Sequence, residues 1–557
     1  MSIALPVLPN SEGFIADLLR EQHSLTAVEK FSKLHASTEH LQARYYRDLL
    51  PSSPPRQGYQ FAFEVNLDRC SGCKACVVAC HSMNGLEDDE VWRQVGTTTT
   101  NEPLGRIQHV TTACHHCEEP GCLQGCPVKA YVKDPETGIV RHLDDQCMGC
   151  KYCTMMCPYE VPQYSTRLGI VRKCDMCHQR LSAGEAPACV QGCPNEAIAI
   201  REVAVDARSD RRNERLAPHA PASSMTRPTT IYKTDHSQDF DSSLPQDLGI
   251  DEVADNHWPL VCMLVTTQAS VGLLLVERVL ALLQSLTSEG SNESITRIAI
   301  LLSLGLALLG LGIAPLHLGQ PLRAWRVFLG LRTSWLSREA VVLGMYVGLL
   351  MLAAAWWWYS AVQSFVPATV DDWVHAMPPV TAEALLWGTL LLGFAGLISS
   401  GMVYVATQRN LWRMSRTLPR FLASGILSGA ACLLPLLAFQ RIPLGLYIAA
   451  TSFTCVMLGA KLIWERSLYT KNSGSNADRR STRLAIGPLR WLLRVRFATS
   501  LVAMALLMAA VISVGAGGAS AVVIAAATAV LILSGEFAER LLYFTTIVYD
   551  RMPGTLR

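Results

Sequence analysis

Residues 147–158 read CMGCKYCTMMCP, with cysteines at positions 147, 150, 153 and 157. This C-x2-C-x2-C-x3-C spacing is the ligand pattern of cubane iron–sulfur clusters, in which the fourth cysteine serves the other cluster of a pair. Pro158 follows the last cysteine and fixes φ where the loop turns. The stretch therefore predicts a fold of short loops wrapped around paired metal clusters.

Sixteen of the nineteen cysteines lie between Cys70 and Cys193, in four groups of this kind. The groups are Cys70, Cys73, Cys76 and Cys80; Cys114, Cys117, Cys122 and Cys126; Cys147, Cys150, Cys153 and Cys157; and Cys174, Cys177, Cys189 and Cys193. Insertions in the second and fourth groups lengthen a loop without removing a ligand. Sixteen thiolates suffice for four [4Fe-4S] clusters, so we expect the chain to conduct electrons.

Disulfides and zinc are the competing uses of so many cysteines. Disulfides belong to exported proteins, and the first residues, MSIALPVLPNSEGF, show neither a signal-peptide pattern nor twin arginines. Zinc sites are usually built from C-x2-C pairs rather than from triples followed by a fourth cysteine. We therefore favour clusters assembled in a compartment that keeps thiols reduced.

The composition divides the 557 residues into four regions. We predict an N-terminal helical extension over 1–58, a ferredoxin-like α+β domain with four clusters over 59–205, a linker over 206–257 and a membrane anchor over 258–557. The linker has few apolar runs and is expected to lie as a tether on a surface. The formal net charge is only +2, so no strong field favours nucleic acid as a partner.

Eight apolar stretches follow His257, each close to the ~20 residues that cross a hydrocarbon core of roughly 30 Å. They lie near 258–283, 298–316, 341–363, 383–406, 422–438, 443–464, 497–515 and 519–535. This pattern predicts an all-α bundle of eight transmembrane helices in contact with lipid, although the shortest one or two stretches would also fit buried or re-entrant segments.

Loop charges predict how the anchor is oriented. The loops after the second, fourth and sixth stretches carry sixteen basic residues, whereas the other loops hold only Arg297 and Arg441. Cytoplasmic loops are enriched in Lys and Arg. We therefore expect an inner (cytoplasmic) membrane protein, multi-pass, with the cluster domain facing the cytoplasm.

The anchor needs a group that exchanges electrons with the clusters. A two-haem cytochrome b needs four axial histidines, and this half has only His257, His317 and His375, so no haem is expected. A quinone site needs less: a protonatable group at the mouth of the bundle. His317, at the end of the second stretch, suits this role because imidazole titrates near neutrality, and Glu339 opens the third stretch on the same side. The plainer alternatives are an interface histidine and a carboxylate at a helix N-terminus.

Other polar residues near the stretches receive structural interpretations. Glu277 and Arg278 are adjacent, so they do not share a helix face and are not an obvious pair. Glu536 and Arg540 are spaced i, i+4 and are expected to pair structurally. Cys262, Cys432 and Cys455 are isolated in apolar surroundings and are read as small core residues.

The cysteine groups, their Cys-Pro endings and the stretch KCDMC at 173–177 resemble the four-cluster electron-transfer subunit of the DMSO reductase (molybdopterin) family. The segment from Trp258 to the C-terminus resembles the DmsC-type membrane anchor. The resemblance implies that group one pairs with group four and group two with group three. The implied sets are site I (Cys70, Cys73, Cys76, Cys193), site II (Cys80, Cys174, Cys177, Cys189), site III (Cys114, Cys117, Cys122, Cys157) and site IV (Cys126, Cys147, Cys150, Cys153). It also implies that His317 and Glu339 are close to bound quinol.

The DMSO reductase proper faces the periplasm, whereas the loop charges here place the clusters in the cytoplasm. This resembles the cytoplasm-facing members, such as the membrane-bound sulfite dehydrogenase that feeds quinone. We expect an electron-transfer and anchor subunit that works with a separate molybdopterin catalytic subunit and the quinone pool. The alternatives left open are a quinol-driven reductase of nitrate, DMSO or polysulfide, and, remotely, a cluster-containing scaffold or sensor.

Overall fold

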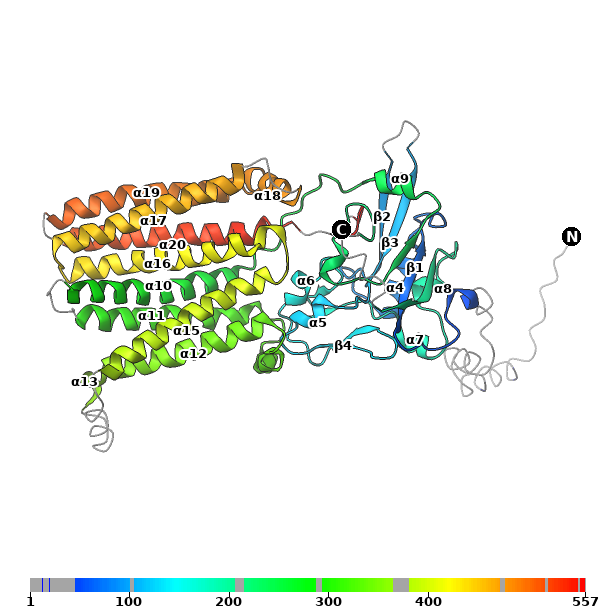
Figure 1. Cartoon of the computed structure of the whole chain (residues 1–557), viewed down its shortest axis with the longest axis horizontal. Coiled ribbons are helices and arrows are strands. Elements are labelled where there is room, and N and C mark those ends of the chain that lie inside the picture. The colour runs from blue at the N-terminus through cyan, green and yellow to red at the C-terminus, as the bar shows by residue number, and fades with distance from the viewer. Residues whose placement is uncertain are drawn as a thin grey trace.

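The computed structural model describes residues 46–100, 105–205, 215–286, 293–363, 380–470, 476–515, 519–548 and 551–555, together with Gly13 and Arg20. Strands and short helices form one body, and long helices lying side by side form a second body next to it (Figure 1). Most of the predicted N-terminal extension, 1–58, lies outside the described residues. Its described end contains one 3-10 turn, η1 (Arg47–Leu49).

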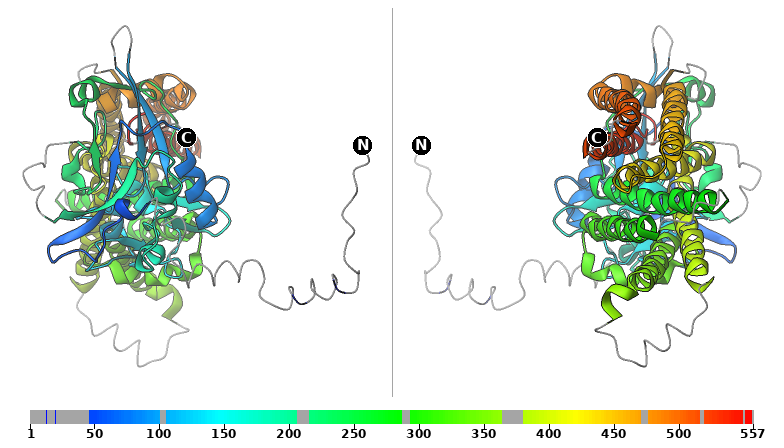
Figure 2. Two further views of the ribbon diagram at one scale, coloured as in Figure 1. Left: turned by 90° about the vertical axis from the view of Figure 1, so that its right-hand side faces the viewer. Right: turned by 90° about the vertical axis from the view of Figure 1, so that its left-hand side faces the viewer.

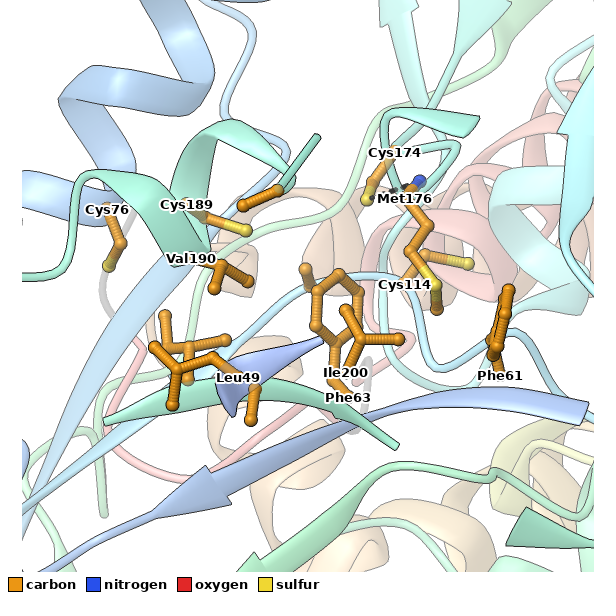
Figure 3. Packing of buried hydrophobic residues seen from close by; sticks show 14 of the residues in the cluster. Leu49, Phe61, Phe63, Cys76, Cys114, Cys174, Met176, Cys189, Val190 and Ile200 are labelled. Carbon is orange, nitrogen blue, oxygen red and sulfur yellow. Dashed lines mark hydrogen bonds between the residues drawn. The ribbon is translucent and has the colours of Figure 1, made fainter. Parts of the chain in front are cut away.

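A three-stranded sheet forms the core of the cluster domain. Strand β1 (Tyr59–Asn66) pairs antiparallel with β8 (Ile198–Ala204), with Phe63 opposite Ile200. The other edge of β1 pairs in parallel with β9 (Ile231–Lys233). Phe63 and Ile200 are buried among cysteines of three different groups, as Figure 3 shows. The apolar faces of these strands thus pack against the loops that carry the sulfur atoms.

Shorter elements complete this domain. A second sheet orders β10 (Leu244–Pro245), β2 (Gln94–Thr99) and β3 (Ile107–Thr112). Two hairpins are β4 (Tyr131–Lys133) with β5 (Val140–His142), and β6 (Gln163–Ser165) with β7 (Ile170–Arg172). The helices are α4 (Ala75–Asn84), α5 (Gly121–Gly125), α6 (Tyr152–Met156), α7 (His178–Ser182), α8 (Ala188–Gln191) and α9 (Ser237–Ser242).

The described part of the predicted linker (206–257), residues 215–257, contributes strands to the cluster domain. Strands β9 and β10 both come from this segment and extend the two three-stranded sheets. Thr229 is buried and donates a hydrogen bond to the carbonyl of His115 at 2.7 Å. Strands of two or three residues bury too few side chains to leave an apolar run in the sequence. For this reason the composition of the segment indicates a tether rather than part of a domain.

Among the residues that the structure describes, eight helices are long and apolar enough to cross a membrane, as predicted. They are α10 (Trp258–Leu286), α11 (Glu293–Ile313), α12 (Trp335–Trp357), α15 (Val380–Val405), α16 (Met414–Phe439), α17 (Leu444–Thr470), α19 (Arg490–Gly515) and α20 (Ala519–Thr545). Figure 2 shows the bundle end-on, with α10 surrounded by its neighbours. The fold class, an α+β ferredoxin-like domain joined to an all-α helical bundle, is therefore confirmed.

Helix α20 runs ten residues past the stretch predicted to end at 535. Glu536, Glu539 and Arg540 made its end look polar, but all three are buried inside the bundle. Glu536 pairs with Lys461 and with Arg496, the latter at 3.0 Å. A charge in lipid is costly unless it is paired, so the partners on α17 and α19 are what allow the helix to continue.

Two predictions about charged pairs are wrong. Arg540 does not pair with Glu536; it contacts Glu539 at 3.6 Å and donates to Gln268 and Ser424, each at 3.0 Å. Glu277 and Arg278 do pair, by two hydrogen bonds of 2.6 Å. Long side chains can curl around a helix, so residues on different faces still meet when both must be satisfied inside a bundle.

The residues after α20 return to the cluster domain. Met552 is buried in a core cluster with Val65 and Val110. The Gly554 N–H donates to the Asp247 carboxylate at 2.7 Å, and the Thr97 N–H donates to the Gly554 carbonyl at 3.2 Å. The chain therefore fastens both ends of its helical bundle to the same domain.

Candidate functional site

The loops of sites I and IV wrap their cysteines in the same conformation. In both loops a glycine and the lysine two residues later have positive φ: 71° and 60° for Gly72 and Lys74, 70° and 58° for Gly149 and Lys151. Positive φ is favourable for glycine and uncommon for other residues. The repeated strain follows from bending three sulfur atoms toward one centre.

Three of the predicted cysteine sets each surround a small cavity. All four cysteines of site I line one cavity, all four of site III line a second, and all four of site IV line a third. In site II the Cys80 and Cys189 thiols interact electrostatically with each other and with Cys177. Within the described residues, no three His, Cys, Asp or Glu side chains form the ligand group of a single metal ion. The arrangement of four sulfur atoms around a cavity is suited to holding a cluster of several metal ions.

The chemistry of these sulfur atoms also fits a cluster. Burial raises the pKa of the Cys80 thiol to about 12 and that of the Cys157 thiol to about 11. Such groups become thiolates at neutral pH only when a metal supplies positive charge. Buried cations lie beside them: Arg93 interacts with sulfur atoms of sites I and II, and Lys173 contacts the Cys114 sulfur of site III at 3.6 Å.

The four sites follow one another through the domain. Cys76 of site I and Cys189 of site II interact, as do Cys174 of site II and Cys114 of site III. Figure 3 shows the first pair close together and the second pair on either side of Met176. Buried Tyr131 interacts with Cys122 of site III and with site IV. The order is I, II, III, IV, with an exposed cysteine, Cys73, at the first site.

A larger cavity, of about 240 Å³, lies where site IV meets the helical bundle. The cluster domain contributes Cys150, Tyr152 and two methionines, and the bundle contributes His317, Glu339 and Tyr404 among mainly apolar neighbours. Cys150 lines this cavity and also the cavity of site IV. A molecule in the larger cavity would therefore lie against a cysteine of site IV.

The structure brings the two predicted residues of the anchor, His317 and Glu339, into this one cavity. The His317 imidazole lies beside the Cys150 backbone, and its edge meets the ring of His257 at a centroid distance of 5.1 Å. The Ser400 hydroxyl lies next to the Glu339 carboxyl. Among the described residues, neither Nε2 of His317 nor Oε1 of Glu339 has a hydrogen-bond partner. Buried polar atoms without partners are positioned for a ligand.

Two groups beside this pair keep fixed protonation states. Burial, and secondarily Lys151, lowers the pKa of His257 to about 4, so that ring is neutral above this pH. Burial, and secondarily Glu339, raises the pKa of Tyr152, whose hydroxyl donates to the Val403 carbonyl at 2.7 Å. The structure thus places two neutral groups beside His317 and Glu339.

Sequence reasoning did not identify Tyr152 or Tyr404 as lining residues. Tyr152 follows Cys150 by two positions, so its place in a ligand loop was an available signal, but Tyr404 is one aromatic among many near a helix end. Arg323 and Arg409 were counted only as loop charges. Arg323 donates to the carbonyls of Asp144 and Cys147 at 3.0 and 2.9 Å, and Arg409 donates to that of Cys157 at 3.0 Å.

Close backbone contact joins the two halves next to the cavity. The Gly319 N–H donates to the Gly149 carbonyl at 3.3 Å. A Cβ added to Gly319 would lie 2.1 Å from the Gly169 carbonyl oxygen and 2.6 Å from the Tyr164 hydroxyl. A side chain larger than hydrogen is therefore excluded at 319.

Gly319→Val is expected to lower the free energy of unfolding by roughly 1–3 kcal/mol, the usual cost of overpacking. The measurement is denaturant-induced loss of cluster absorbance in the purified full-length protein. Gly312→Val is the matched control, because nothing lies within 4 Å of a Cβ at that position. Equal midpoints for the two variants would show that the halves do not meet at Gly319.

Comparison with known proteins covers both halves. A family model described as DMSO reductase anchor subunit (DmsC) matches residues 253–546, more than half of the chain. A 4Fe-4S dicluster domain model matches residues 106–203.

Curated relatives match the cysteine-rich half. The B subunit of the anaerobic dimethyl sulfoxide reductase of Haemophilus influenzae is 31% identical over 184 residues, which are 31% of this chain and 89% of that protein. The corresponding B subunit from Escherichia coli K12 is 32% identical over 183 residues, covering 31% and 88%. The iron-sulfur subunit of the nitrate-inducible formate dehydrogenase of E. coli K12 is 34% identical over 168 residues, covering 26% and 57%.

Proposed function

The chain belongs to the family of DMSO reductase anchor subunits (DmsC), and on that premise we propose that it passes electrons between a separate molybdopterin catalytic subunit and the membrane quinone pool. One polypeptide combines an iron–sulfur electron-transfer subunit with a multi-pass membrane anchor. When bound, four [4Fe-4S] clusters carry electrons singly, and a quinone takes up or releases two electrons with two protons.

One observation carries the quinone assignment: Cys150 is a wall shared by site IV and by the cavity of His317 and Glu339. A ligand of the last cluster, two titratable side chains and an apolar lining meet at the end of the bundle. This combination suits a lipophilic molecule whose redox change requires proton transfer. A purely structural role for the cavity would require none of these three features.

The roles of the residues follow from their contacts. The unpartnered Nε2 of His317 exchanges a hydrogen bond and a proton with one quinone oxygen. The buried Glu339 carboxyl takes or gives the second proton. Tyr152 does not titrate in this scheme; its hydroxyl bonds the Val403 carbonyl and thereby holds α6 against α15, which keeps Cys150 at the cavity wall.

We propose that the catalytic partner docks at the opposite end of the row of sites, and the exposure of Cys73 of site I supports this. The basic loops after the second, fourth and sixth spans support a cytoplasmic position for the cluster domain. With the clusters and quinone site on one side, electrons would flow without charge crossing the bilayer. This orientation favours a substrate oxidised in the cytoplasm, and sulfite is the substrate class we propose.

A quinol-driven reductase is the second candidate. The observation that favours it is the similarity of the cysteine-rich half to the B subunits of dimethyl sulfoxide reductases over most of their length. The same row of clusters would then carry electrons from quinol toward nitrate, a sulfoxide or polysulfide. Metal analysis and identification of the large subunit that co-purifies with the protein separate the two candidates.

Quinol added to isolated anaerobic membranes is expected to reduce the clusters of the full-length protein, seen as a loss of their visible absorbance. The physical reason is the shared wall at Cys150, which leaves no intervening layer between the cavity and site IV. Dithionite added to a parallel sample gives the full extent of reduction. Clusters that respond to dithionite and never to quinol would contradict the proposed quinone site.

A further inference from the structure

A short helix beside the cavity has three chemically different faces. Helix η5 (Pro321–Gly330) is a 3-10 helix, which has three residues per turn, so residues three apart lie on one face. The first face is apolar and exposed: the residues Leu322, Trp325 and Phe328 have accessible fractions of 92%, 66% and 59%. Three turns in register make this a continuous stripe, which we call the outer stripe.

The second face binds the cluster domain. Arg323 donates to the carbonyls of Asp144 and Cys147, and Arg326 donates to that of Asp145 at 2.8 Å. Both guanidinium groups thus donate hydrogen bonds to the loop that leads into site IV. The Arg326 guanidinium also lies over the Trp325 ring, 5.5 Å from its centroid, so this cation borders the outer stripe while its hydrogen bond goes to the cluster domain.

The third face closes the cavity. Ala324 and Val327 line the cavity that also contains His317 and Glu339. At the end of the same face, a Cβ on Gly330 would lie 2.6 Å from the Pro127 carbonyl oxygen, so the helix is seated directly on the cluster domain. The helix therefore separates the cavity from whatever covers the outer stripe.

The position of η5 identifies what covers it. It lies between η4 (Ala314–His317), which ends the second span, and α12, which begins the third span. In Figure 1 this light-green coil lies at the edge where the bundle meets the cluster domain, at the level of the helix ends. An exposed stripe of Leu, Trp and Phe at that level is typical of a helix lying in the membrane interface.

A protein partner fits the outer stripe less well. The stripe carries no charged side chain, and it lies at the site IV end of the domain, whereas the exposed Cys73 that marks the opposite end belongs to site I. Cavity-lining Pro315 on η4 is itself exposed, so the wall of the cavity reaches the same lipid-facing surface.

We propose that the outer stripe of η5 is embedded in the lipid leaflet on the cluster side. We also propose that η5 forms the rim of the cavity entrance, called the threshold below, which a lipid-dissolved quinone crosses to reach the cavity. The second part of this inference rests on the proposed function. The first part does not, since it concerns only lipid contact. The stripe holds the helix at the depth of the quinone headgroup while Arg323 ties it to site IV.

Lipid contact is tested by fluorescence of the full-length protein in liposomes with brominated acyl chains, which quench tryptophan on contact. The signal of Trp325 is the difference in tryptophan fluorescence between the wild-type protein and the Trp325→Phe variant. It is expected to be quenched more by bromine near the headgroup than by bromine near the bilayer centre. Trp92→Phe, in the cluster domain, is the matched control and its difference signal should not be quenched. A Trp325 signal quenched at neither depth, as under a protein partner or in water, would overturn the proposal.

The threshold role is tested by the variant Leu322→Glu/Phe328→Glu with two quinols. KM for a long-tailed quinol is expected to rise about tenfold, because charge lifts the stripe out of the lipid, while KM for a short-tailed, water-soluble analogue stays unchanged. Ile107→Glu, an exposed apolar position on β3, is the control. An equal rise for both quinols would show distortion of the cavity and reject the threshold. Failure of wild type to react with any quinol would instead reject the proposed function.

Discussion

Replacing His317 with glutamine is expected to slow quinol-driven reduction of the clusters by about 100-fold or more, the usual range for loss of a general acid or base. Glutamine keeps a hydrogen-bond donor of similar reach, but it cannot take up or release a proton near neutral pH. The Nε2 atom of His317 is buried and without a partner in the described part of the chain, so it is available to the ligand. The measurement is rapid mixing of quinol with anaerobic membranes.

Two controls make the result specific. Dithionite should reduce the clusters of His317→Gln to the wild-type extent, because it bypasses the cavity. His236→Gln, at an exposed histidine of the cluster domain, should react with quinol at the wild-type rate. If His317→Gln also kept that rate, the cavity would have to use Glu339 alone or have another purpose.

Replacing Cys150 with serine is expected to have the second large effect, because this cysteine borders both cavities. Loss of one thiolate should leave site IV with a three-iron cluster or none, so that the iron content of the protein falls and quinol-driven reduction drops by about 100-fold. Electron paramagnetic resonance of oxidised and reduced samples reports the cluster type. Iron and sulfide analysis reports the loss.

Cys262→Ser provides the comparison, since Cys262 lies on α10 and lines neither of the two cavities. It should keep all of the iron and the wild-type rate. A Cys150→Ser protein with unchanged iron and unchanged resonance signals would show that Cys150 is not a ligand. It would also remove the structural link between the cavity and site IV.

The sequence predicted the fold class because its signals are local and strong. Each cysteine group lies within at most twenty residues, and each membrane span is a single apolar run. What local patterns could not predict depends on contacts between distant residues. In the sequence, Glu536 marks the end of an apolar run. Only the structure shows that Lys461 and Arg496 pair with it inside the bundle.

The candidate site was likewise predicted only in part. His317 and Glu339 were chosen from residue chemistry and position at helix ends, and the structure brings them into one cavity. The cavity-lining face of η5 could not be anticipated, because 3-10 helices of this length are uncommon and the basic residues of 321–330 indicated a loop. Arg323 was counted only as a basic loop residue, so its hydrogen bond to the Cys147 carbonyl was not predicted.

The segment 551–555 has a consequence for how the protein assembles. Relatives such as the B subunit of dimethyl sulfoxide reductase span little more than the cysteine-rich half, whereas here that half is tied to the helices at 257 and again through Met552 and Gly554. If the contacts of Met552 and Gly554 open, the peptide connection at 257 keeps the two halves at a high effective concentration, so rebinding is intramolecular. The ratio of electron carrier to anchor is thereby fixed at one to one, independent of the amounts synthesised.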